Sequence, residues 1–221
     1  MKLQSFSDKT IWTEFTLSFL DIAKLACEKC EEIEKNNEFT TSYYYIPTLK
    51  ISIIYNIKHA LELLLKLLIR TIDNDLNELL GGKDGHNIEF LLLKLQNKIP
   101  IKELKSIENE IEDPYTREFF SNVLKNLDDQ LEELRQLVIK YNQLKFLKQD
   151  LIQLEDYNNT AFKYPENKFQ IYASLDYFNF IFHNGHESIK ISMLHEDINN
   201  LRVKITNIGR VFEIYHWHKN K

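Results

Sequence analysis

The sequence predicts a mainly α protein, an antiparallel helical bundle of about five long helices with a small β-hairpin near the C-terminal side. First, the 221 residues include only five Gly and four Pro, and long helices with short connections need few such chain-breakers. Second, apolar residues recur at three- and four-residue spacing along most of the chain. Third, one aromatic, β-favouring stretch precedes the last helical pattern. No linker divides the chain, so we expect a single helical domain over residues 1–221, with a hairpin insertion at about 166–193.

Two long helices are predicted in the first third of the chain. An apolar stripe extends from about Ser7 to about Lys35. Pro47 suits the first turn of a second helix, which carries the most apolar stretch, Ile51–Ile72. That stretch is long enough to span a membrane, but five ionisable side chains inside it would be too costly in a bilayer, so we expect a buried core helix and no membrane partner. The five are Lys58, His59, Glu62, Lys66 and Arg70.

Three further helices are expected in the middle of the chain, after the glycine-rich loop Gly81–Gly85. The first extends from about His86 to Lys98, and the second from Pro100 to Ile111. The third, from Pro114 to about Asp156, is predicted to be the longest. Apolar residues in it keep a strict four-three alternation, as in a coiled-coil seam. The seam consists of Phe120, Leu124, Leu127, Leu131, Leu134, Val138 and Tyr141.

The aromatic stretch near the C-terminal side predicts the hairpin. Residues 168–183 would form its first strand, Asn184-Gly185 is a favoured two-residue turn, and residues 186–192 would form the return strand. A last helix, from about His195 to His218, then follows with clean helical spacing of its apolar residues.

Charge and cysteine content limit the function classes. A net charge of −5 argues against a protein that coats nucleic acid non-specifically, although a local basic site remains compatible with it. Cys27 and Cys30 are the only cysteines, so there is no disulfide framework and we expect a cytoplasmic protein. Their spacing matches a redox motif, but with no preceding strand we expect buried core thiols.

A polar stripe interrupts the otherwise apolar second helix. Five residues fall within an arc of roughly 80° on the helical wheel; they are Tyr55, His59, Glu62, Lys66 and Arg70. Two interpretations are open. The stripe is either a solvated edge with self-paired charges, or a partly desolvated site in which a titratable His lies beside the Glu62–Lys66 pair.

Three short motifs, in this order, resemble one branch of the HEPN superfamily of helical-bundle domains. They are His59–Lys66 (HALELLLK), Asp84–Leu92 (DGHNIEFLL) and Phe162–Pro165 (FKYP). That branch shows His-Ala and Glu-Leu-x-x-Lys on one helix, Gly-His-x-Leu opening a later helix, and a downstream Arg-Tyr-Pro. The resemblance covers about residues 46–165.

The chain departs from that pattern at two positions. Lys163 stands where the branch has Arg, which keeps the cation but loses the planar fork for bidentate phosphate binding. Ile88 stands where Leu is usual. The resemblance implies that six residues converge on one face and bind a ligand, with Asp84 capping the helix after His86 and leaving backbone N–H groups for an anion. The six are His59, Glu62, Lys66, His86, Lys163 and Tyr164.

The resemblance also implies a function. Many HEPN proteins are metal-independent ribonucleases that use an Arg and a His with four to six residues between them, paired across a homodimer. Only Arg210 and His216, with five residues between them, meet this spacing here. We therefore expect an RNA-binding protein or endoribonuclease of a defence or toxin–antitoxin type system, without cofactor or metal. Its partners would be RNA or a nucleotide, a second copy, and a protein such as an antitoxin.

Two alternatives remain open. One is a non-catalytic helical interaction module, in which the aromatic hairpin and the seam of the long helix bind a partner. The other is a small-nucleotide sensor, which the clustered His and Lys would suit. Motifs of P-loop, dinucleotide, serine-hydrolase and zinc-protease sites do not occur in the sequence.

Overall fold

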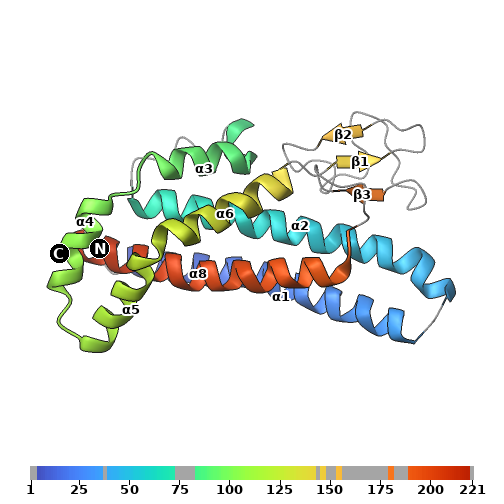
Figure 1. Ribbon diagram of the computed structural model, residues 1–221, viewed down its shortest axis with the longest axis horizontal. Helices are drawn as coiled ribbons and strands as arrows, with labels where there is room; N and C mark the ends of the chain where they lie inside the picture. The colour runs from blue at the N-terminus through green and yellow to red at the C-terminus, as the bar shows by residue number, and fades with distance from the viewer. Residues whose placement is uncertain are drawn as a thin grey trace.

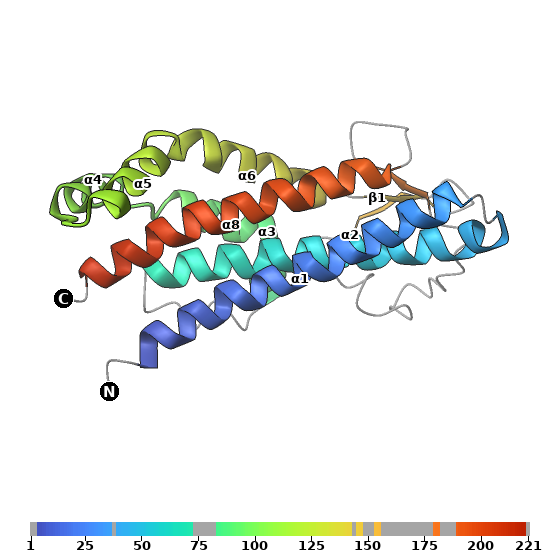
Figure 2. The same cartoon turned by 90° about the horizontal axis from the view of Figure 1, so that it is seen from below.

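The computed structural model describes residues 4–36, 39–72, 83–142, 145–147, 153–155, 179–181 and 189–219. The protein is mainly α, as predicted. Three long helices, α1 (Gln4–Lys35), α2 (Phe39–Ile72) and α8 (Ile191–Lys219), lie side by side along the longest axis of the molecule (Figure 1). Both views show that α1 is antiparallel to α2 and α8 (Figure 2). Arg202 on α8 forms an ion pair with Asp21 on α1, which ties these two helices together.

Four shorter helices pack against this trio. They are α3 (Ile88–Gln96), α4 (Ile101–Glu110), α5 (Pro114–Lys125) and α6 (Leu127–Asn142), and a 3-10 turn, η2 (Lys83–His86), leads into α3. Asp113 caps α5, where its Oδ2 accepts a hydrogen bond of 2.7 Å from the amide of Thr116, and Pro114 occupies the first turn as predicted. The hydrogen bond holds the pKa of Asp113 below its usual value.

The prediction of one helix from Pro114 to Asp156 is wrong. The helix breaks at Asn126, whose side chain donates to the carbonyl of Asn122 and whose backbone leaves helical geometry. It resumes as α6 and ends at Asn142. The predicted seam is nevertheless largely buried on both sides of the break, from Phe120 to Tyr141. Burial of the apolar stripe therefore does not depend on one continuous helix.

The second helix begins earlier than predicted. Pro47 lies inside α2 instead of in its first turn, because the helix starts at Phe39. Proline removes one backbone hydrogen bond from a helix interior, at a cost of about 3 kcal/mol in isolation. Burial of the neighbouring Ile46 and of the apolar residues that follow from Ile53 offsets that cost.

The strands form a small sheet of a different kind from the predicted hairpin. Its order is β2-β1-β3, with β1 (Lys145–Leu147) antiparallel to both β2 (Gln153–Glu155) and β3 (Asn179–Ile181). Of the predicted return strand, residues 186–188 lie outside the described residues, as does the Asn184-Gly185 turn. Residues 189–190 are not in a strand and residues 191–192 begin α8, so the strand prediction is wrong there.

The core is continuous across the helices, with α2 at its centre. Nearly every apolar side chain of α2 from Ile53 to Ile69 is buried, as expected for a helix surrounded by others. A buried polar contact joins α6 to α8: Tyr141 Oη donates to Asp197 Oδ2 at 2.7 Å, and Lys140 Nζ lies 2.6 Å from the same oxygen. Within the described ranges, no helix is long and apolar enough to span a membrane.

Candidate functional site

The site is centred on the buried carboxylate of Glu62. Its side chain is only 4% exposed, and that of Lys66, one turn later on α2, is 9% exposed. Lys66 Nζ donates to Glu62 Oε1 at 2.6 Å. The interpretation of the polar stripe as a solvated edge is therefore wrong for these two residues, which form a charged pair inside the core.

His86 brings a second donor to the same oxygen from a different part of the chain. Its Nδ1 lies 3.0 Å from Glu62 Oε1. Because an ionised carboxylate only accepts, Nδ1 carries the proton, and a neutral imidazole then has its lone pair on Nε2. The side chain of His86 is 44% exposed. The carboxylate therefore orients an imidazole that is nearly half exposed to solvent.

The helix start after His86 fixes this geometry. Asn87 is the N-cap of α3, and its Oδ1 accepts hydrogen bonds of 3.1 Å from the amides of Glu89 and Phe90. The expectation that Asp84 caps this helix is wrong, because α3 begins at Ile88. Two of the first amides are thus already satisfied, so the helix start offers an anion fewer donors than expected.

His59 lies on the other side of the carboxylate, one turn before it. Its Nδ1 is 3.8 Å from Glu62 Oε2, too far for a hydrogen bond, and this buried nitrogen has no hydrogen-bond partner among the described residues. The ring packs edge-on against Phe19, at a centroid distance of 4.5 Å, and parallel to Tyr55 at 5.8 Å. His59 is therefore held by aromatic packing, with an unused polar atom facing Glu62.

These neighbours decide the charge state of Glu62. Burial alone would raise the pKa of its carboxyl, but the nearby imidazole of His59, the hydrogen bond and charge of Lys66, and the charge of His86 outweigh burial and lower the pKa to about 2. Glu62 is consequently ionised throughout the physiological pH range. The ionised carboxylate accepts from Nδ1 of His86 and so leaves Nε2 as the nitrogen of that ring that is not bonded to Glu62.

Lys163 and Tyr164, the other two residues of the predicted binding site, lie outside the described residues. The structure thus brings together four of the six: His59, Glu62, Lys66 and His86. Arg70, which shares the helical stripe, is half-buried. No group of three metal-ligating side chains occurs within the described part of the chain.

Arg210 and His216 do not form a site within one chain. Arg210 is exposed, and its guanidinium carbon lies 5.2 Å from the centre of the Phe119 ring on α5. His216 is buried, and its Nδ1 faces the carbonyl of Thr71 on α2 at 3.4 Å. The two are six positions apart on α8, which places them about 120° apart around the helix. They therefore face different neighbours.

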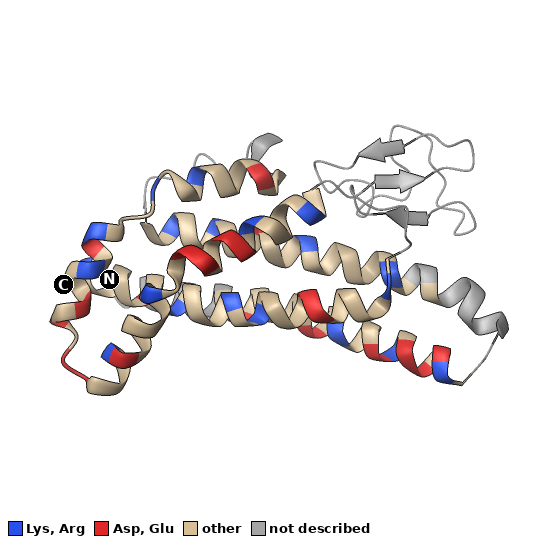
Figure 3. Ribbon diagram, viewed as in Figure 1, with Lys and Arg blue, Asp and Glu red and all other residues tan. Residues whose placement is uncertain are grey.

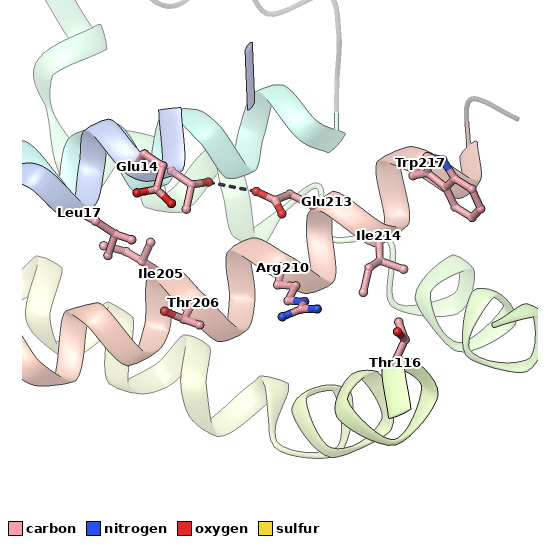
Figure 4. A pocket seen from close by; sticks show the side chains of 10 residues that line it. Glu14, Leu17, Thr116, Ile205, Thr206, Arg210, Glu213, Ile214 and Trp217 are labelled. Carbon is pink, nitrogen blue, oxygen red and sulfur yellow. Dashed lines mark hydrogen bonds between the residues drawn. The ribbon is translucent and has the colours of Figure 1, made fainter. Parts of the chain in front are cut away.

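A pocket of about 610 Å³ opens beside Arg210, between α1, α5 and α8 (Figure 4). Its α1 wall includes Thr13, whose Oγ1 donates to Glu213 Oε1 at 3.0 Å. The side chain of Trp217, at the far end of the pocket along α8, is 46% exposed. The periodicity of the sequence gave no sign of this pocket, since it depends on how three helices diverge.

Two other residues near the site had no sequence signal. Asn142 is 1% exposed at the end of α6, and its Nδ2 donates to Glu89 Oε2 on α3 at 2.7 Å. This hydrogen bond joins α6 to α3, the helix that follows His86.

Cys27 and Cys30 are buried as predicted; burial raises the pKa of Cys27 to about 12 and that of Cys30 to about 11, so both are inert thiols.

Comparison of the chain with protein-family models, with curated proteins and with solved structures finds no match in any of the three.

Proposed function

We propose that the protein is a HEPN-like helical bundle of the cytoplasm that binds RNA and acts as a metal-independent endoribonuclease in a defence or toxin–antitoxin type system. One observation carries the proposal: the half-exposed imidazole of His86 is held by the buried, ionised carboxylate of Glu62. Both residues, with His59 and Lys66, belong to the motifs that resemble the HEPN branch, and the four side chains meet around one carboxylate.

The chemistry follows from which atoms are free. Nε2 of His86 would take the proton of a ribose 2′-hydroxyl, whose oxygen attacks the adjacent phosphorus. The bond from phosphorus to the 5′-oxygen breaks, and that oxygen takes a proton from water, which leaves a 2′,3′-cyclic phosphate and a 5′-hydroxyl. Lys66 is buried and bonded to Glu62, so it holds the carboxylate in place and does not contact the phosphate. We assign the cation that neutralises the phosphate to Lys163.

This proposal moves the catalytic role away from Arg210 and His216. A histidine that transfers a proton to RNA must reach solvent, and His216 is 8% exposed. Arg210 is exposed but points about 120° around α8 from His216, towards Phe119 and not towards Thr71. His86 meets the requirement of exposure that His216 does not.

The charge distribution favours a short contact with RNA. Figure 3 shows Lys and Arg intermixed with Asp and Glu along the helices in that view, without a broad basic face (Figure 3). The net charge is −5. We therefore expect single-stranded RNA to be bound over a few nucleotides near His86, with a shallow dependence on salt.

A second candidate, a non-catalytic interaction module, has one observation in its favour. Large apolar side chains are exposed on α1, where Phe15 and Ile22 are each 51% and Leu25 is 65% exposed. Such a row on one helix is typical of a surface that binds another protein. It is compatible with RNA binding elsewhere on the molecule and with a protein partner such as an antitoxin.

The test uses the full chain, a labelled single-stranded RNA and EDTA in the buffer. We expect cleavage by the wild type and a loss of at least about a hundredfold in His86→Gln. The matched control is His195→Gln, because His195 Nδ1 also lies near a carboxylate, 3.2 Å from Glu31 Oε1, on another part of the surface. The control should cleave at the wild-type rate.

The other outcomes are equally informative. If the wild type bound RNA without cleaving it, and His86→Gln lost this binding, the proposed RNA-binding site would stand and the proposed nuclease activity would be wrong. Cleavage that persists in His86→Gln would show that the site is elsewhere. A pure wild-type protein that neither binds nor cleaves RNA would contradict the proposal and leave the interaction module.

A further inference from the structure

Four ring side chains of α1 and α2 form a continuous cluster beside Glu62. Phe15 packs edge-on against Phe19, with 5.1 Å between the ring centroids, and Phe19 packs edge-on against His59 at 4.5 Å. His59 in turn lies parallel to Tyr55 at 5.8 Å. We call these four residues the aromatic cluster. The proposed proton transfer uses none of the four rings.

The aromatic cluster is largely covered at one end and exposed at the other. The side chain of His59 is 17% exposed, and Phe19 and Tyr55 are half-buried. Phe15, at the other end, is 51% exposed. An aromatic ring in water gains free energy when it is covered, most of all by another flat ring. Because contact with Phe19 already restrains the ring of Phe15, a planar ligand would order it at little further cost.

Phe15 lies level with the candidate site. Because α1 and α2 are antiparallel, one turn back along α1 from Phe19 corresponds to one turn forward along α2 from His59 (Figure 2). That step leads to the turn of α2 that contains Glu62, the residue bonded to His86. The exposed ring of Phe15 and the half-exposed imidazole of His86 therefore lie beside the same stretch of α2.

A nucleobase is the planar group that an RNA strand would present to this ring. Unpaired bases stack on aromatic side chains, and each stack adds affinity with little dependence on sequence. The net charge of −5 and the intermixed charges along the helices provide only weak attraction for phosphates. An RNA strand bound to this chain therefore needs a contribution from its bases, and Phe15 is the most exposed ring of the aromatic cluster.

We infer that Phe15 stacks on an unpaired base of the strand whose phosphate lies at His86, with the rest of the aromatic cluster holding Phe15 in place. This inference rests on the proposed function, because it names the part of the RNA that the same site recognises. It makes the substrate an unpaired stretch, since the neighbouring bases cover both faces of a base inside a duplex. Phe15 is then a binding residue, which raises affinity and leaves the chemical step to His86.

Ile22 provides a matched control on the same helix. It is 51% exposed, as Phe15 is, and it lies seven positions later, on the same side of α1 and about 10 Å along it. That step leads away from Glu62, because α1 and α2 are antiparallel. Ile22 and Leu25 remain available for a protein partner, whereas Phe15 alone of the three belongs to the aromatic cluster. The inference therefore requires Phe15 and Ile22 to differ in RNA binding.

The test measures binding of the full chain to single-stranded RNA in which fluorine replaces every 2′-hydroxyl, so that the strand cannot be cleaved. Fluorescence anisotropy gives the dissociation constant for this strand and for an abasic strand with the same backbone. The wild type is expected to bind the strand with bases at least about tenfold more tightly. Phe15→Leu keeps an apolar side chain but removes the ring. It should weaken binding of the strand with bases by at least about tenfold and leave binding of the abasic strand unchanged, which also shows that the variant is folded.

Two further variants and a kinetic measurement sharpen the test. Phe15→Tyr keeps the ring, and Ile22→Ala lies outside the aromatic cluster, so both should bind the two strands as the wild type does. With unmodified RNA, Phe15→Leu should raise KM by at least about tenfold and leave kcat within about twofold, because stacking contributes equally to the ground state and the transition state. A fall in kcat with an unchanged KM would mean that Phe15 acts through His86 and not by stacking, and the inference would be wrong.

The remaining outcomes separate the inference from the proposed function. If the wild type bound the two strands equally, or if Phe15→Leu bound the strand with bases as well as the wild type, the inference would be overturned while RNA binding would stand. Equal losses in Phe15→Leu and Ile22→Ala would also overturn it and would favour α1 as a protein-binding surface. A wild type that bound neither of these strands nor unmodified RNA would contradict the proposed function, and the inference with it.

Discussion

His86 and Glu62 are 24 residues apart in the chain, yet Nδ1 of the first lies 3.0 Å from Oε1 of the second. The contact joins the turn before α3 to the centre of α2. The same carboxylate oxygen accepts from Lys66 at 2.6 Å, so one buried atom connects an exposed imidazole to a charge in the core. Changes at Glu62 should therefore affect stability and the proposed activity together, and variants can be chosen to separate the two.

Replacing Glu62 by Gln should lower stability and change its dependence on acid. The folded-state pKa of about 2 lies below the ordinary value of 4.5, so Glu62 contributes stability that is fully present above about pH 4.5 and lost as the pH falls towards 2. At about 1.4 kcal/mol per pH unit, this amounts to roughly 3 kcal/mol at pH 7. Glu62→Gln should lose about that much and show a shallower decline between pH 4.5 and 2, as measured by urea unfolding at several pH values.

Glu132→Gln is the matched control for this effect. Its hydrogen bonds to Arg135 and Gln136 also lower the pKa of Glu132 to about 2, but the carboxyl is on the surface, where solvent screens the interaction. The unfolding curves of this variant should resemble those of the wild type. If the unfolding curves of Glu62→Gln matched those of Glu132→Gln, Glu62 would not be buried beside its charged partners in solution.

The buried ion pair should be replaceable without loss of the fold. Lys66→Leu alone leaves the Glu62 carboxylate unpaired by lysine in the core and should destabilise the protein by about 3–5 kcal/mol. The double variant Glu62→Leu/Lys66→Leu removes both charges and should recover most of that loss, since apolar residues of similar volume often substitute well for a buried pair. Denaturant unfolding measures both.

The double variant also separates the structural role from the functional one. It has no acceptor for Nδ1 of His86, so we expect it to be stable but to lose RNA cleavage. Full cleavage by a stable double variant would mean that the pair serves the core alone, and the assignment of Glu62 as the residue that orients His86 would then be wrong.

Removing the cap of α3 should loosen the position of His86. Asn87 satisfies two amides of this helix, and its loss in Asn87→Ala should cost about 1 kcal/mol. RNA cleavage should fall because the neighbouring imidazole is less well held. Asn87→Asp keeps an accepting oxygen and should restore both properties; if it restored only stability, the cap would not position His86.

Helical period alone predicts the elements whose packing is regular. The last helix has apolar residues in clean helical spacing from Ile198 to Tyr215, and all of those that define its inner face are buried in α8. Prediction of a helix from apolar spacing fails after Asn142, because the leucine-rich sequence there is compatible with a strand as well as with a helix. Pairing with β3, more than thirty residues later, decides between them.

The site was predictable in part, for a similar reason. The Glu62–Lys66 pair follows from positions four apart on one helix. The contact of His86 with Glu62 depends on the path of the chain before α3, which helical spacing does not predict. Capping by Asn87 instead of Asp84 depends on the residue at which α3 begins. The separation of Arg210 from His216 was available from the sequence, since positions six apart on a helix point about 120° away from each other.

Both cysteines should be unreactive in the folded protein. Cys27 and Cys30 are fully buried, and burial raises their pKa values to about 12 and about 11. At pH 8 we therefore expect no reaction with Ellman's reagent before unfolding, and two thiols per chain in denaturant. Rapid labelling of the native protein, or a reversible disulfide between the two, would support the redox motif instead.

The contact between Tyr141 and Asp197 should stabilise the junction of α6 and α8. Tyr141 is fully buried, and burial together with the charge of Asp197 raises its pKa well above its ordinary value of 10, so the phenol is a donor at neutral pH. Tyr141→Phe removes the hydrogen bond of 2.7 Å to the buried carboxylate and leaves the contact of that carboxylate with Lys140 in place. Hydrogen bonds to charged groups contribute about 1.5–3 kcal/mol. The free energy of unfolding of the variant should fall by that amount, and its urea unfolding midpoint should be correspondingly lower. Tyr115→Phe, at a site 83% exposed, should unfold as the wild type does, and equal effects of the two substitutions would show that Asp197 does not rely on Tyr141.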